Sequence, residues 1–145
     1  MTLSLQGQVA FITGGGSGLG AAAARRLAAD GAIVAINDLN LDAAKKVADE
    51  LGGLAFAFDV TDSAAFQSAV DTCVAQLGRL DIMINNAGIA PNDAASKMDL
   101  VMENMGKRMA GNIAEMEPTN YLLDLSDENW DRMIKVHLYG TFYGC

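Results

Sequence analysis

A run of glycines close to the start of the chain limits its fold more than any other feature. Residues 8–13 are a short apolar run, and residues 18–29 are rich in alanine, a strong helix former. A strand that passes through glycines into a helix leaves unpaired N–H groups that can surround a phosphate. A tight strand-to-helix turn without a ligand has the same pattern. The predicted contacts to such an anion are Gly14, Ser17, Gly18, Leu19 and Gly20.

The first half of the chain alternates short apolar runs with stretches of helical periodicity. This alternation is typical of successive βα units that form a parallel sheet covered on both faces. The predicted fold class is therefore α/β, a doubly wound parallel sheet of the Rossmann type. The predicted strands are residues 8–13, 33–37, 54–58 and 80–85, and the predicted helices are residues 18–29, 41–51 and, capped by Asp62, 63–77.

The acid that ends the second predicted strand points to a particular ligand. In open α/β sheets, ligands bind beyond the carboxyl ends of the strands, where Asp38 is expected to accept hydrogen bonds from adenosine ribose hydroxyls. Its charge would repel a 2′-phosphate, and Leu39 after it supplies no positive charge. The pattern predicts NAD in preference to NADP. A solvated loop carboxylate, or the similar glycine turn and acid of an S-adenosylmethionine-dependent methyltransferase, is the alternative.

Three segments together resemble the short-chain dehydrogenases/reductases. Residues 13–20 match the TGxxxGxG pattern of that family, residues 85–88 match its NNAG motif, and residues 59–62 resemble its segment after the third strand. This combination disfavours the methyltransferase. The resemblance implies that Asp59 contacts the adenine amino group and Val60 the adenine ring. It places Asn86 against the adenine ribose and extends the cofactor site to Leu39, Ala87, Gly88 and Val136.

Residues 130–142 resemble the long fifth helix of the family. His137 stands where most members have an asparagine whose backbone holds a water connected to the catalytic lysine, so the resemblance makes it a candidate catalytic residue. An ordinary packed histidine is the alternative. In the family, the catalytic serine and a Tyr-x-x-x-Lys motif follow this helix. Neither Tyr121 nor Tyr139 has a lysine four residues later, and Tyr143 lies two residues before Cys145.

The chain is therefore expected to be the N-terminal part of a longer enzyme, with residues 1–145 as an NAD-binding Rossmann domain that is incomplete at its C-terminus. The consecutive apolar residues of the fourth strand suit a central strand. The last helix has a cap at Ser126 but no matching stop signal. The resemblance implies hydride transfer between a nicotinamide and a secondary alcohol or ketone. A non-catalytic NAD-binding or sensing module is the alternative.

The stretch between the NNAG motif and the fifth helix is longer than is usual in the family, and residues 92–125 are predicted to form a helical insertion. Its apolar side chains recur at helical spacing and predict one amphipathic helix. Such a methionine-rich face is suited to lining an apolar pocket, to contact with another subunit, or to ordinary packing. Its members are Met98, Val101, Met102, Met105, Met109, Ile113 and Met116.

Composition narrows the partners further. The net charge of −8 disfavours nucleic acid and anionic membranes. With no apolar run of about 20 residues and no signal-peptide pattern, the expected location is the cytoplasm. Only Cys73 and Cys145 are present, which indicates neither a disulfide framework nor a metal site. The expected partners are a small alcohol or ketone substrate and further copies of the same chain.

Overall fold

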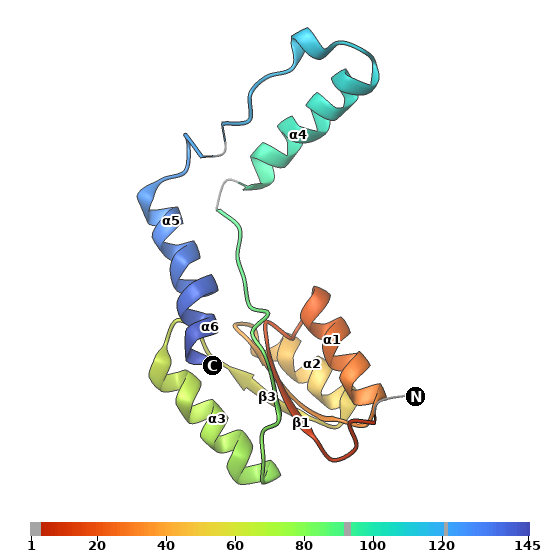
Figure 1. Cartoon of the computed structure of the whole chain (residues 1–145), viewed down its shortest axis with the longest axis vertical. Helices are drawn as coiled ribbons and strands as arrows, with labels where there is room; N and C mark the ends of the chain where they lie inside the picture. Colours follow the sequence, from red (N-terminus) through yellow and green to blue (C-terminus); the bar gives the residue numbers. More distant parts are fainter. Residues whose placement is uncertain (1–3, 92–93, 121) are drawn as a thin grey trace. The chain divides into compact units, whose positions relative to one another are not determined.

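The computed structural model describes residues 4–91, 94–120 and 122–145. They form two compact units, coloured along the chain in Figure 1. We call Met1–Gly88 with Lys135–Cys145 the sheet unit, and Ile89–Ile134 the helical unit.

The sheet unit is built on a parallel four-stranded sheet with the order β3-β2-β1-β4. This arrangement confirms the predicted doubly wound α/β class, and the described residues form its N-terminal portion. The predicted helices are observed with unchanged bounds, and the strands differ by a few residues at their ends. In chain order the elements are β1 Val9–Thr13, α1 Gly18–Ala29, β2 Ile33–Asp38, α2 Leu41–Leu51, β3 Leu54–Ala57, α3 Ser63–Leu77 and β4 Ile82–Ile84.

Alternation along the buried strands divides the core into two layers. Ala10 and Ile12 of β1 face α1 and α2, where the small side chains of Ala24 and Ala44 permit close packing. Phe11, between them in sequence, faces the opposite side, which α3 covers with Ala69 and Cys73. Its ring lies against Phe56, Phe58 and Phe66. Every residue of β1 is buried because both faces of the sheet are covered.

Local side-chain chemistry sets the helix ends. Asn40 Oδ1 accepts hydrogen bonds from the N–H groups of Asp42 and Ala43, and Asp62 caps α3 in the same way. Gly78 ends α3 with a φ of +82°, which favours glycine. The Asp62 cap was predicted from the sequence, whereas the Asn40 cap was not.

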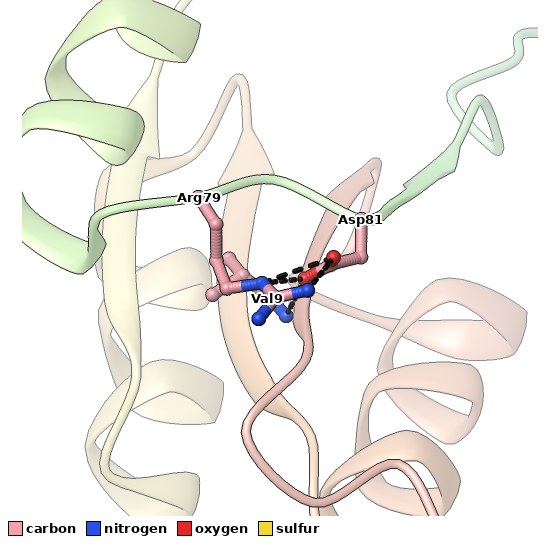
Figure 2. Close-up of polar contacts among 3 residues, drawn as sticks. All are labelled: Val9, Arg79 and Asp81. Carbon is pink, nitrogen blue, oxygen red and sulfur yellow. Dashed lines mark hydrogen bonds and ion pairs between the residues drawn. The ribbon is translucent and has the colours of Figure 1, made fainter.

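The fourth strand, β4, is shorter than predicted at both ends, and a carboxylate lies just before its start. Asp81 Oδ2 accepts the Val9 N–H at 2.8 Å, and the Arg79 guanidinium binds both oxygens of the same carboxylate (Figure 2). The Arg79 guanidinium, followed by the Val9 N–H, holds the pKa of Asp81 below its ordinary value. Within the described residues β4 pairs only with β1, at an edge, whereas its apolar pattern predicted a central strand.

The helical unit contains α4 Ala94–Met109, the short helix η1 Ile113–Glu115 and α5 Asp127–Ile134. The single helix predicted through Met116 is wrong, since α4 ends at Met109 and Gly111 turns the chain with a φ of +83°. Buried Asn104 then binds the backbone of Glu117 twice: its Nδ2 donates to the carbonyl at 2.6 Å, and its Oδ1 accepts the N–H at 3.0 Å. These bonds hold the returning segment along α4.

The predicted fifth helix is divided into segments. Its predicted start is confirmed, because Ser126 Oγ accepts the Asn129 N–H at 3.2 Å just before α5. In the sheet unit, Lys135–Tyr139 (η2) is a wider π-helical turn, and Gly140–Tyr143 (α6) follows it. A π turn inside a helix often marks a functional site.

Candidate cofactor site

The N-terminus of α1 follows the glycine turn and has no side-chain cap. Gly14 and Gly18 have φ values of +62° and +52°, so the turn uses backbone conformations that side chains disfavour. Ser17 precedes the helix, but its side chain caps no N–H group. Helix geometry therefore leaves the N–H groups of the first turn without intrahelical acceptors, at the positive end of the helix dipole. The Leu19 side chain points away from the core and is 84% exposed.

Asn86 joins the glycine turn to the end of β4. Its Nδ2 donates to the carbonyl oxygens of Thr13 and Gly14, each at 3.1 Å. A Cβ at Gly20 would overlap the Gly14 carbonyl oxygen and lie 2.6 Å from Asn86 Nδ2. A Cβ at Gly14 would lie 3.0 Å from Ala87 Cα. The structure therefore brings these predicted residues together, and Gly20 is required for their packing.

Thr13 begins the glycine motif, but the sequence analysis gave its side chain no role in the site. Its buried Oγ1 accepts the N–H groups of Asn86 and Ala87, both at 3.1 Å, and donates to the Ile84 carbonyl at 3.4 Å. The signal was present, because Thr13 is the polar residue that ends an otherwise apolar strand. Its hydroxyl fixes the turn after β4 to the end of β1.

Asp38 is fixed by two backbone donors. Oδ2 accepts the Gly16 N–H at 3.1 Å, and Oδ1 accepts the Asn40 N–H at 3.0 Å. A Cβ at Gly16 would lie 2.8 Å from Oδ2, so only glycine allows this approach. The Asp38 carboxylate thus lies beside the glycine turn, while the Leu39 side chain is 71% exposed.

Asn37, which the sequence did not identify, connects neighbouring strand ends through its side chain and its main-chain carbonyl. Its buried Nδ2 donates to the Phe58 carbonyl at 3.1 Å, and its own carbonyl accepts the Gly15 N–H at 2.8 Å. The carboxyl ends of β1, β2 and β3 are thereby connected through a single side chain and its backbone.

Asp59 and Val60 follow β3 and have different surroundings. Asp59 is exposed, and its Oδ1 accepts both the N–H and the hydroxyl of Thr61, at 2.9 and 2.8 Å. Val60 is buried, and a Cβ at Gly140 would lie 2.8 Å from its Cγ2. Close packing of α6 against Val60 therefore depends on Gly140.

His137 lies against the NNAG turn. A Cβ at Gly88 would be 2.7 Å from the Cε1 atom of the His137 ring, so the ring occupies the space that a side chain would take. The His137 main-chain carbonyl accepts the Thr141 hydroxyl at 2.7 Å, and Val136 beside it is half-buried. Asn85 Nδ2 donates to the Thr141 carbonyl at 3.4 Å. The π turn and the NNAG motif thus form one connected surface.

Comparison with known proteins identifies the family. The sequence pattern described as short chain dehydrogenase matches residues 8–145. The chain belongs to the short-chain dehydrogenase family. A D-threitol dehydrogenase of Mycolicibacterium smegmatis is 36% identical over 97% of this chain and 46% of its own length. A 7alpha-hydroxysteroid dehydrogenase of Escherichia coli is 44% identical over 59% of this chain and 36% of its own length.

Solved structures of the short-chain dehydrogenase family agree with the fold. A 3-ketoacyl-(acyl-carrier-protein) reductase from Brucella melitensis, crystallised with NADH, has a TM-score of 0.74 and 33% identity. The match covers 97% of this chain and 48% of that one. The chain spans about half the length of such relatives.

The described part of this short-chain dehydrogenase chain lacks two kinds of feature. None of its helices has both the length and the apolar character needed to cross a membrane. Nor do three or more of its His, Cys, Asp and Glu side chains gather in an arrangement that suits a metal ion.

Proposed function

We propose that this chain is the NAD-binding part of an oxidoreductase that transfers a hydride between the nicotinamide and a secondary alcohol or ketone. One observation carries the proposal: the Asp38 carboxylate is held by the Gly16 N–H beside the open N-terminus of α1. The N–H groups at the start of α1 would bind a pyrophosphate, and the neighbouring Asp38 carboxylate would accept hydrogen bonds from ribose hydroxyls. NAD, whose adenosine ribose carries no 2′-phosphate, requires both.

The residues present fit this cofactor. The N–H groups of Gly18, Leu19 and Gly20 would bind the pyrophosphate at the start of α1, with Gly14 and Ser17 shaping the approach. The predicted contacts with adenosine come from the ends of β2, β3 and β4. We assign these to Asp38, Leu39, Asp59, Val60, Asn86, Ala87 and Gly88, with Val136 from the π turn. When bound, NAD supplies the hydride acceptor and NADH the donor.

We further propose that His137 positions the NNAG turn through its ring and helps to orient the reacting end of the site. Its contact with Gly88 supports this role. Proton exchange with the alcohol hydroxyl requires a tyrosine assisted by a lysine and a serine that orients the oxygen, which is general acid–base catalysis. By resemblance to the family, we expect the whole protein to supply this tyrosine, lysine and serine, in addition to the motifs found in residues 1–145.

The cofactor assignment is tested by titration of the chain with NADH and NADPH, followed by the fluorescence of the reduced nicotinamide. NADH is expected to bind more tightly, because Asp38 repels a 2′-phosphate. Asp38→Asn should weaken NADH binding about tenfold and reduce the difference in affinity between NADH and NADPH. Asp42→Asn makes the same charge change at an exposed side chain on α2 and should alter neither. Tighter binding of NADPH by the unmodified chain would overturn the assignment.

A non-catalytic NAD-binding or sensing module is the second candidate function. The cofactor-site features described above, Asp38 beside the glycine turn among them, would serve a binding module equally well. The two functions are distinguished by assaying the whole protein with a panel of secondary alcohols in the presence of NAD. Formation of NADH supports the oxidoreductase, whereas NADH binding without turnover of any alcohol supports the module.

We propose a homo-oligomer in the cytoplasm as the working form. Leu138, Tyr139 and Phe142 are exposed large side chains close together in η2 and α6, and exposed apolar clusters mark interfaces. Cys73 is a free thiol, as is usual in a reducing compartment. Sedimentation equilibrium of the whole protein tests the oligomer, and a monomer would contradict it.

We also propose that residues 1–145 are one cofactor domain interrupted by a helical insertion at 92–125.

A further inference from the structure

The helical unit contains an apolar groove of about 630 Å³ that belongs to that unit alone. Val101, Met105 and Met109 of α4 form one wall, and Met116 and Thr119 of the returning segment form the other. A volume of a few hundred Å³ is typical of sites for small ligands. Methionine side chains line such sites well because they are flexible and polarizable.

The two polar residues of the groove differ in what they already bind. Asn104 is buried, and both its Nδ2 and its Oδ1 form hydrogen bonds with the backbone of Glu117. It therefore shapes the groove and is not available to a ligand. Arg108 is exposed at the groove and makes no ion pair or hydrogen bond with any residue that the structure describes. An unpaired guanidinium beside an apolar wall attracts a ligand that has an anionic end.

The neighbouring cation provides a contrast. Lys107 forms an ion pair with Glu103 at 2.8 Å, one turn earlier on α4, and does not line the groove. Of these adjacent basic residues, one is neutralised on the helix surface and the other lines the apolar groove without a counterion among the described residues. Charge complementarity at the groove therefore favours an anionic ligand.

We propose that this groove binds a small amphipathic carboxylate, such as a medium-chain acyl acid, with the chain against the methionines and the carboxylate on Arg108. None of its lining residues belongs to the proposed cofactor site, and its occupation does not require NAD. A carboxylate fits the planar guanidinium through two parallel hydrogen bonds, which an alcohol of the same chain length lacks.

Calorimetric titration of the full chain with decanoate and with decanol, both below their aggregation limits, tests the proposal. Decanoate should bind saturably, and Arg108→Gln should weaken it about tenfold while decanol binding stays unchanged. Lys107→Gln removes the same charge from the adjacent position and should leave both ligands unaffected. Met105→Glu should abolish binding of decanoate, because it adds a carboxylate to the apolar wall.

Three results would overturn the inference. They are equal weakening of decanoate by Arg108→Gln and Lys107→Gln, absence of saturable binding, and binding only to micelles or only when the chain self-associates through α4. Circular dichroism of each variant confirms that α4 is retained. NADH titration of the unmodified chain separates the two proposals, since absence of saturable decanoate binding together with the expected NADH binding contradicts only the groove.

Discussion

The sheet unit and the helical unit place their apolar residues in opposite ways. In the sheet unit, Val9, Phe11 and Ile12 have no exposed surface, and helices cover both faces of the strand that carries them. In the helical unit, Met102 is 62% exposed and Met109 is 82% exposed, although both lie on a helix with regular apolar spacing. An apolar pattern thus becomes a core only where other elements close over it.

Each unit is consequently stabilised internally by a different kind of interaction. Burial of large side chains stabilises the sheet unit. The helical unit depends on specific polar contacts, namely the Asn104 bonds to Glu117 and the Lys97 ion pair with Asp124 at 3.0 Å. Substitutions of comparable chemistry should therefore have unequal effects in the two units.

The largest expected difference concerns truncation of apolar side chains. Phe11→Ala removes a ring that is fully buried among three other phenylalanines and should lower the free energy of unfolding by about 3–5 kcal/mol. Met109→Ala should change it by less than about 0.5 kcal/mol. Urea denaturation followed by circular dichroism measures both. Equal losses would show that the exposed face of α4 is covered in solution.

A second contrast compares glycines. Gly20→Ala drives a methyl group into the Gly14 carbonyl and the Asn86 amide, and should weaken NADH binding at least about tenfold. Gly106→Ala is the matched control, because nothing lies within 4 Å of a Cβ there, and it should stabilise α4 by up to about 1 kcal/mol. NADH titration and thermal unfolding measure these effects. Unchanged affinity in Gly20→Ala would remove the packing argument for the turn.

The polar clamp of the helical unit is the third test. Asn104→Ala removes two hydrogen bonds to Glu117 and should destabilise the returning segment locally by about 1–3 kcal/mol, without lowering the stability of the sheet unit. Hydrogen exchange at the Glu117 amide should accelerate. Asn112→Ala, at a side chain that forms no cap bond, should leave that exchange unchanged. Global unfolding of the chain by Asn104→Ala would contradict the separation of the units.

The contrast also explains which features could be predicted from sequence. The bounds of α1 and α2, the Asp62 cap and the order of strands and helices in the sheet unit follow from local propensity and from the glycine turn. The side-chain hydrogen bonds of Thr13, Asn37 and Asn104 were not predicted, because their partners lie 13 or more residues away in sequence. The π turn and the end of α4 depend on backbone geometry that apolar spacing does not encode. Periodicity predicts a face, but not what covers it.

The smallest expected effects concern the dependence of stability on pH, which should have opposite signs in the two units. The pKa of Asp81 is lowered mainly by Arg79 and then by the Val9 N–H, so its contribution to stability is complete above its unfolded pKa of about 3.9 and is lost as pH falls through the lower folded value. Asp81→Asn should therefore flatten the acid limb of the stability curve of the sheet unit.

In the helical unit the pKa of Lys107 is raised by Glu103, so that contribution is complete below the ordinary lysine pKa of about 10.4 and is lost as pH rises through the folded value. Because the pair is exposed to solvent, the effect should be small and should vanish at high salt. Urea titrations at acid, neutral and alkaline pH, with Glu103→Gln and Asp81→Asn in parallel, measure both limbs. An acid limb unaltered by Asp81→Asn would mean that its link between β1 and β4, drawn in Figure 2, adds no stability to the sheet.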